Sequence, residues 1–125
     1  MTTALSQIAQ IALPARDIAR AVQFYRDALG LRFLFEAPPK MAFFDCDGVR
    51  LLIGEGGGAG AGPSSSILYF RVANIQSAQV DLAARQVRFV REAHLVARLP
   101  DHELWLAFFE DSEGNALALM EERRT

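Results

Sequence analysis

Residues 108–115 of the chain, Phe-Phe-Glu-Asp-Ser-Glu-Gly-Asn, repeat in outline a stretch that lies 65 residues earlier. That earlier stretch, residues 43–48, is Phe-Phe-Asp-Cys-Asp-Gly. In both, two aromatic residues and an acid precede a tight turn with glycine, which is typical of a β-hairpin. Asp17 and Asn74 form a second matching pair, 57 residues apart, and each precedes a helical pattern. The chain is therefore predicted to contain two copies of one structural unit.

Each predicted unit has the order strand, helix, strand, strand, strand. In the first unit, apolar residues at 18, 22, 25 and 29 have the spacing of one helix face, which Asp17 can cap. Gly30 follows where a helix end favours a left-handed residue. A second helix is expected after Asn74. Strands are expected at 8–13, where Pro14 ends the first, and then at 31–36, 41–45, 49–53, 67–72, 87–93, 103–110 and 115–121.

A segment rich in glycine and serine, residues 55–66, separates the two units and shows no apolar periodicity. Such a composition predicts a flexible connector. We therefore expect one domain over residues 1–125, with a first module at 1–54 and a second at 67–125. Because each module has one helix to cover one sheet face, the other face is left free. The expected fold class is α+β, with two tandem βαβββ modules that form a curved, cup-like mixed sheet.

The composition excludes several classes of protein. An apolar fraction of 51% and a charged fraction of 22% argue against a disordered chain. Thirteen Lys and Arg residues against fifteen Asp and Glu, without a basic cluster, argue against a nucleic-acid partner. No apolar run approaches the roughly 18 residues of a membrane span, and the polar start lacks a signal-peptide pattern. With Cys46 as its single cysteine, the protein is expected to be cytoplasmic, without disulfides or a membrane partner.

Two motifs resemble those of a known group of proteins. The pattern D-I-x5-F-Y-x3-L-G-L at residues 17–31 is similar to the entry motif of the vicinal oxygen chelate superfamily. That superfamily includes glyoxalase I, bleomycin-resistance proteins, extradiol dioxygenases and methylmalonyl-CoA epimerase. Residues 109–115 resemble its closing F-x-D-P-D-G-N turn, with Ser112 in place of the usual proline. The resemblance covers nearly the whole chain, and it implies the paired-module fold and a homodimer.

The resemblance also implies where metal-using members hold a divalent ion. Four cup-facing side chains bind the ion, one from the first and one from the last strand of each module. Carried over by motif, they are Gln10, Leu52 (Leu51 if the register slips by one), Ile67 and Ala118. Some glyoxalase I enzymes use Gln at the first position, but the three aliphatic side chains cannot donate to a metal. We therefore expect no metal and no other cofactor.

Strand alternation predicts which other side chains line the cup. An apolar cavity with a few polar groups is typical of small-molecule sites, and arginine offers paired donors to a carboxylate or phosphate. The further cup candidates are Arg50, Tyr69, Arg71, Trp105, Phe109 and Met120. Alternatives stay open for several of them. The arginines could lie at strand ends in solvent, Tyr69 and Trp105 could be ordinary packing, and the sequence does not decide which face Trp105 and Phe109 occupy.

Three functions remain after these observations. The first is a metal-independent protein that binds a small molecule in the cup, where the arginines favour an anionic or aromatic ligand over a cationic drug. The second is a divalent-metal-dependent lyase, isomerase or dioxygenase of the same superfamily, which the missing donors disfavour. The third is an interaction module with a vestigial cup. His94 and His102 match no ligand position of the family and are expected in loops. The connector permits a cup within one chain or across two.

Overall fold

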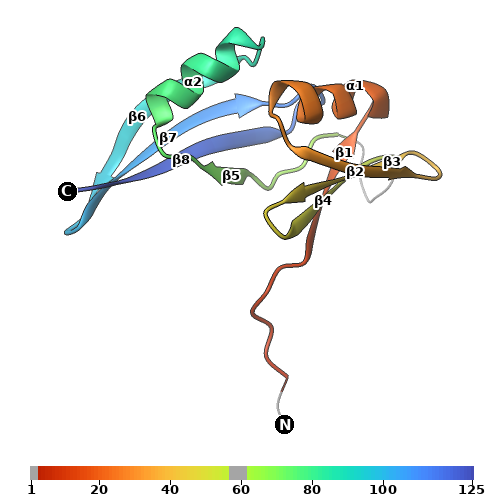
Figure 1. Cartoon of the computed structure of the whole chain (residues 1–125), viewed down its shortest axis with the longest axis horizontal. Helices are drawn as coiled ribbons and strands as arrows, with labels where there is room; N and C mark the ends of the chain where they lie inside the picture. Colours follow the sequence, from red (N-terminus) through yellow and green to blue (C-terminus); the bar gives the residue numbers. More distant parts are fainter. Residues whose placement is uncertain (1–2, 57–61) are drawn as a thin grey trace.

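A computed structural model describes residues 3–56 and 62–125, and it contains two four-stranded sheets, each with a helix on one face (Figure 1). The first module contains β1 (Gln10–Ala15), α1 (Ile18–Gln23), a π-helical turn η1 (Phe24–Ala28), β2 (Arg32–Ala37), β3 (Met41–Cys46) and β4 (Val49–Glu55). The second contains β5 (Leu68–Arg71), α2 (Ile75–Ala84), β6 (Phe89–Arg98), β7 (His102–Glu110) and β8 (Ala116–Arg124). Neither helix in these ranges is long and apolar enough to cross a membrane.

The two sheets have the same topology. Their strand orders are β1-β4-β3-β2 and β5-β8-β7-β6, and in each the first strand runs parallel to the last while the other pairs are antiparallel. No described strand of one sheet pairs with a strand of the other. In Figure 1 both helices lie on the same side of the sheets, above β1–β4 and β5–β8. The predicted α+β fold of two βαβββ modules is confirmed.

Matching polar residues begin the two helices. The Asp17 side chain accepts a hydrogen bond from the Arg20 backbone N–H at 3.1 Å, and Asn74 accepts one from Ser77 at 2.9 Å. The predicted caps are therefore present in both modules. After α1, the chain widens into the π-helical turn η1, and Gly30 follows with a φ of 74°.

The two helices and the covered sheet faces share a single hydrophobic core. Its largest members that are almost fully buried come from both modules: Tyr25, Phe44, Leu51, Ile53, Ile75, Phe109 and Leu117. Because each strand alternates its side chains, the residues between these core positions point to the opposite side of the sheet. The helix layer therefore fixes which side chains remain available for a site.

Several predicted boundaries were wrong. Pro14 does not end the first strand: it lies within β1, an edge strand, where the missing N–H of proline is tolerated. Glu55, counted with the connector, is the last residue of β4. The strand β6 is longer than expected, so His94 lies inside it, and His102 begins β7 instead of lying in a turn. The central connector, residues 57–61, lies outside the described residues.

Candidate functional site

The sheet faces that carry no helix are called the open faces here, and they hold most of the predicted cup residues. On the first sheet, Gln10 pairs in register with Arg50, and Ala12 with Leu52. Gln10 and Arg50 are exposed and Leu52 is half-buried, whereas Leu51 is 1% exposed in the core. Leu52, not Leu51, therefore occupies the open face, which settles the register that the sequence left open.

Two stacked phenylalanines and an arginine form the most distinctive group on the first open face. The rings of Phe35 and Phe43 lie with their centroids 4.6 Å apart and 21° between their planes. The Arg50 guanidinium carbon lies 6.0 Å from the Phe35 centroid and 5.9 Å from that of Phe43. Phe35 is 44% exposed. We call these three residues the aromatic–arginine platform.

Arg50 is free to bind a further group. In the described parts of the chain it makes no ion pair, although Asp45 faces it in the register of β3 and β4. The Asp45 carboxylate instead accepts the backbone N–H of Gly48 at 3.1 Å. A guanidinium over aromatic rings retains planar N–H donors at its edge. The platform therefore offers a flat apolar surface beside a cationic donor.

A pocket of about 540 Å³ adjoins the platform, because Leu52 in its wall pairs in register with Phe43. Glu55 also belongs to the lining, although alternation along β4 places its carboxylate on the helix side. It accepts the backbone N–H of Ile18 at 2.8 Å and lies 3.6 Å from Lys40 Nζ. The lining residues are Ala12, Leu13, Pro14, Pro39, Met41, Leu52, Gly54, Glu55, Gly56, Gly62, Pro63, Ser64 and Ser65. All of them belong to the first module or the connector.

The second open face is also aromatic but carries its charge at the rim. Tyr69 is 49% exposed and meets Phe108 edge to face, with ring centroids 6.2 Å apart. Ala118 pairs in register with both of these residues and is fully buried. Arg71 pairs in register with the half-buried Met120 and lies 3.7 Å from a carboxylate oxygen of Glu122. Arg71 thus matches the alternative of a surface residue paired with an acid.

Two predicted cup residues, Trp105 and Phe109, lie on the helix side of the second sheet, so their placement in the cup was wrong. Phe109 is 1% exposed and pairs in register with Leu117 of the core. Trp105 lies on the same side of β7, and the Arg123 guanidinium stacks 4.6 Å from its ring centroid.

Ile67, the third of the superfamily's metal positions, precedes β5 and is 38% exposed.

Tyr69 was among the predicted cup residues, but sequence reasoning missed three other aromatic residues of the open faces, Phe35, Phe43 and Phe108. A signal for two of them was present, because Phe43 and Phe108 are the first aromatic residues of the two repeated stretches. Their neighbours Phe44 and Phe109 are both buried under the helices. Alternation within the repeat thus assigns the first phenylalanine of each pair to the open face.

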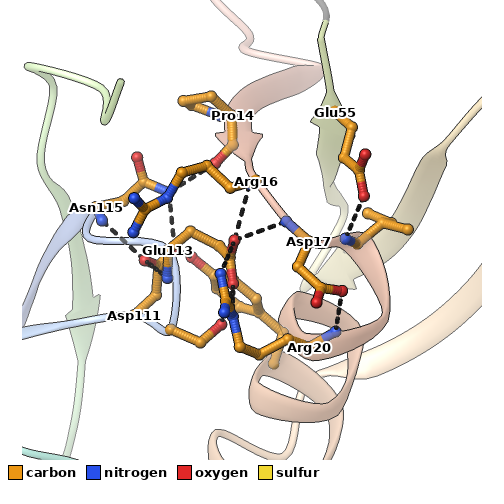
Figure 2. A network of polar contacts seen from close by, with 11 residues as sticks. Pro14, Arg16, Asp17, Arg20, Glu55, Asp111, Glu113 and Asn115 are labelled. Carbon is orange, nitrogen blue, oxygen red and sulfur yellow. Dashed lines mark hydrogen bonds and ion pairs between the residues drawn. The ribbon is translucent and has the colours of Figure 1, made fainter. Parts of the chain in front are cut away.

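The turn between β7 and β8 joins the two modules through buried acids (Figure 2). Glu113 accepts the backbone N–H groups of Arg16 and Asp17 at 2.8 and 3.0 Å, and its carboxylate also binds the Arg20 side chain. Asp111 accepts the hydroxyl of Tyr25 at 2.5 Å. The turn fixes α1 against the second sheet.

Asn115 completes the interlock from the same turn. Its side-chain amide donates to the Pro14 carbonyl at 2.9 Å and to Asp111 at 2.8 Å, and its oxygen accepts the N–H of Ser64 at 2.8 Å. One side chain thereby contacts the end of β1, the connector and its own turn. The three residues Asp111, Glu113 and Asn115 are called the interlock from here on.

Burial and hydrogen bonding shift two ionisable groups of this network. Burial raises the pKa of the Tyr25 hydroxyl well above its usual range, and the Asp111 carboxylate beside it adds to that rise. Burial also works to raise the pKa of Glu113, but the donations from Arg20, Ser112 and the two backbone N–H groups outweigh it and hold that pKa at about 2. Near neutral pH the Tyr25 hydroxyl therefore stays neutral and the Glu113 carboxylate stays ionised, and both groups have a structural role.

A family comparison agrees with this architecture. The model of the Glyoxalase/Bleomycin resistance protein/Dioxygenase superfamily matches residues 7–119. The chain belongs to this superfamily. No curated protein sequence matches it.

Solved structures show the same superfamily fold. A lactoylglutathione lyase from Agrobacterium tumefaciens is 23% identical with a TM-score of 0.75, and the match covers 95% of this chain and 96% of that one. TioX from Micromonospora sp. ML1 is 17% identical with a TM-score of 0.76, covering 93% and 98%. A superfamily member from Sphaerobacter thermophilus DSM 20745 is 19% identical with a TM-score of 0.78, covering 94% and 98%. At these identities the likeness shows the fold alone.

The side chains at the superfamily's metal positions do not fit a divalent ion. Gln10 offers one neutral amide oxygen, whereas Leu52, Ile67 and Ala118 are aliphatic, and stable sites need three or four N, O or S donors. Over residues 3–56 and 62–125, no group of three or more His, Cys, Asp or Glu side chains could hold an ion elsewhere. The thiol of Cys46 is a poor metal ligand as well, because burial, followed by the charge of Asp45, raises its pKa.

Proposed function

We propose that this member of the glyoxalase/bleomycin-resistance superfamily is a metal-independent protein that binds an anionic or aromatic organic molecule in its cup. The observation that carries the proposal is the aromatic–arginine platform. A planar ring can stack on the exposed Phe35, while a carboxylate at its edge pairs with the guanidinium of Arg50. Nothing in this arrangement requires a metal to hold the ligand.

The adjoining pocket supplies the volume that such a ligand needs. At about 540 Å³ it lies within the usual size range of small-molecule sites, roughly 300–1,000 Å³. Its apolar wall includes Ala12, Met41 and Leu52. Arg50 on the platform supplies a cation at one end of this apolar space. The Glu55 carboxylate binds the backbone N–H of Ile18 on the helix side, so a ligand with its anionic group toward the platform avoids it.

A second copy of the chain would complete the cup, so the proposal includes a homodimer. In one chain the pocket is lined by the first module and the connector, while the second open face leaves Tyr69 49% exposed. Exposed aromatic residues on both open faces favour their burial against one another. In such a dimer the first module of one copy faces the second module of its partner, and each ligand lies between them.

The proposal is tested with three probes that separate ring from charge: 1-naphthoate, 1-naphthalenemethanol and cyclohexanecarboxylate, titrated by isothermal calorimetry. Naphthoate is expected to bind best, because it alone can use both the phenylalanines and Arg50. The variant R50Q should weaken naphthoate binding about tenfold to a hundredfold, which is the value of a charge-assisted contact. The same variant should leave the affinity for 1-naphthalenemethanol unchanged, because that probe carries no charge.

The matched control is R26Q, which removes an exposed arginine on η1 that pairs with Asp27. This variant should bind naphthoate like the wild type. Equal binding of naphthoate to R50Q and wild type, or equal loss in R26Q, would contradict the proposed site. Light scattering of the same samples checks the dimer, whose ligand stoichiometry should be one probe per chain.

A further inference from the structure

We propose that the chain has a second small-molecule site, on the helix side of the second sheet, that accepts a small uncharged aromatic molecule. A pocket of about 220 Å³ lies there between α2 and the segment that follows η1. It is separate from the cup, because the open face and the helix side are opposite faces of the sheet. Its lining residues are Leu29, Leu31, Phe70, Val72, Ala78, Asp81, Leu82, Arg85, Phe109 and Leu119.

The walls of this pocket are apolar and come from both modules. Phe109 and Leu119 belong to the core and are 1% and 3% exposed. Ala78 and Leu82 contribute one side of α2, and Leu29 comes from the end of the first module's helix; all three are half-buried and pack against the core. The pocket is thus a gap in the packing between the modules, and core side chains form its floor.

The two polar residues at the pocket, Asp81 and Arg85, are already engaged. Arg85 donates to the Ala28 carbonyl at 2.8 Å and lies 3.5 Å from the Asp81 carboxylate. Its side chain therefore extends from α2 to the end of η1. Both residues are well exposed, with side-chain exposures of 45% for Arg85 and 76% for Asp81, so they belong to the mouth of the pocket and not to its interior.

This lining favours an apolar occupant over water. A buried water needs about two to four polar partners, and the aliphatic and aromatic walls provide none. Displacing poorly bound water by an apolar group gains binding free energy. The volume sets the size of the molecule, since a cavity of roughly 150 Å³ lined by similar residues binds benzene. Phe70 and Phe109 in the lining favour an aromatic ring through edge or offset contacts.

The test uses fluorobenzene as the probe and measures its ¹⁹F chemical shift and line width against protein concentration. Binding to the wild type is expected, with competition by benzene. The variant A78F fills the pocket from α2 and should weaken binding at least tenfold. The matched control V80F adds the same ring to the same helix at a residue that is 72% exposed and outside the lining, and it should bind like the wild type.

A second variant keeps the test decisive if A78F does not fold. L82A enlarges the pocket, so it should accept 1-fluoronaphthalene at least tenfold more tightly than the wild type does. The cup variant F35A, which removes the exposed ring of the platform, should leave fluorobenzene binding unchanged, which separates this site from the proposed cup. Fluorobenzene that does not bind the wild type, or that binds A78F as well as V80F, would overturn the proposal. Loss of binding in F35A would overturn it as well, by placing the probe in the cup.

Discussion

The two hairpin turns at equivalent places in the modules have opposite environments. The turn between β3 and β4, residues 46–48, makes one side-chain hydrogen bond, from the Gly48 N–H to Asp45, and it is largely exposed. The turn between β7 and β8 is buried: Glu113 is 2% exposed and Asn115 is fully buried. The same structural unit is therefore used once as a plain hairpin and once as the joint between modules.

The helix N-termini show the same asymmetry. In each module a glutamate near the end of the last strand accepts a backbone N–H of its own helix, Glu55 from Ile18 at 2.8 Å and Glu121 from Ile75 at 2.9 Å. The segment before α1 also donates two backbone N–H groups to Glu113, which belongs to the other module. The repeat thus supplies the fold within each module, whereas the interlock sets how the modules lie against one another.

The largest expected effect comes from breaking the interlock with E113Q. The donors around Glu113 hold its pKa at about 2, and in this variant they lose their ionised partner, so the free energy of unfolding should fall by about 3 kcal/mol. Urea denaturation measures it. The equivalent exposed turn provides the control, because D47N should change stability by less than about 0.5 kcal/mol. Similar losses in the two variants would contradict the asymmetry between the turns.

The lowered pKa of Glu113 should also make the free energy of unfolding fall at acidic pH. Because the pKa of Glu113 is lowered from 4.5 to about 2, its stabilisation is complete above about pH 4.5 and is lost as the pH falls toward 2. The difference in unfolding free energy between wild type and E113Q should therefore shrink over this window. Urea titrations at pH 6, 4 and 2.5 check it. A difference that stays constant over this range would show that the charge of Glu113 is not what stabilises the joint.

The two capping glutamates are expected to differ by a smaller amount. Glu121 is 6% exposed and also binds Arg123 at 2.9 Å, which is the main cause of its lowered pKa, so E121Q should cost about 2 kcal/mol. Glu55 is half-buried and its second contact, Lys40, is 3.6 Å away, so E55Q should cost about 1 kcal/mol. Thermal unfolding of E121Q and E55Q measures which variant loses more stability. Equal costs would mean that the N–H contact alone, and not the ion pair, decides the cost.

The smallest effect distinguishes the two turn glycines. Gly48 and Gly114 have φ values of 97° and 89°, so alanine at either should cost about 1 kcal/mol in backbone strain. A Cβ on Gly114 would also lie 3.2 Å from the Pro63 Cγ, whereas one on Gly48 would meet nothing. G114A should therefore lose about 0.5 kcal/mol more than G48A in urea denaturation. Equal losses would show that Pro63 yields without cost.

Much of this fold could be predicted because the repeated motifs and the helix caps can be recognised from the sequence alone. Asp17 and Asn74 cap as expected, and alternation placed Gln10, Arg50 and Tyr69 on the open faces. Trp105 and Phe109 could not be placed, since alternation says that they share a face but not which face the helix covers.

The interlock was not predicted, because its partners are far apart in sequence. The contacts of Glu113 with Arg16 and Arg20 span more than 90 residues. The acidic turn was recognised only as a family motif, and motif spacing does not say what a carboxylate touches. The stack of Phe35 on Phe43 likewise depends on the register of β2 and β3, which includes a bulge between Phe33 and Phe35. Both features arise from tertiary pairing.

Metal retention shows whether the cup can hold its ligand without a metal. Purified protein would be incubated with Zn²⁺, Ni²⁺, Mn²⁺ and Fe²⁺, desalted, and analysed for metal content per chain. With Leu52, Ile67 and Ala118 at the superfamily's ligand positions, we expect near-zero retained metal. About one tightly held ion per chain, or per dimer, would contradict it.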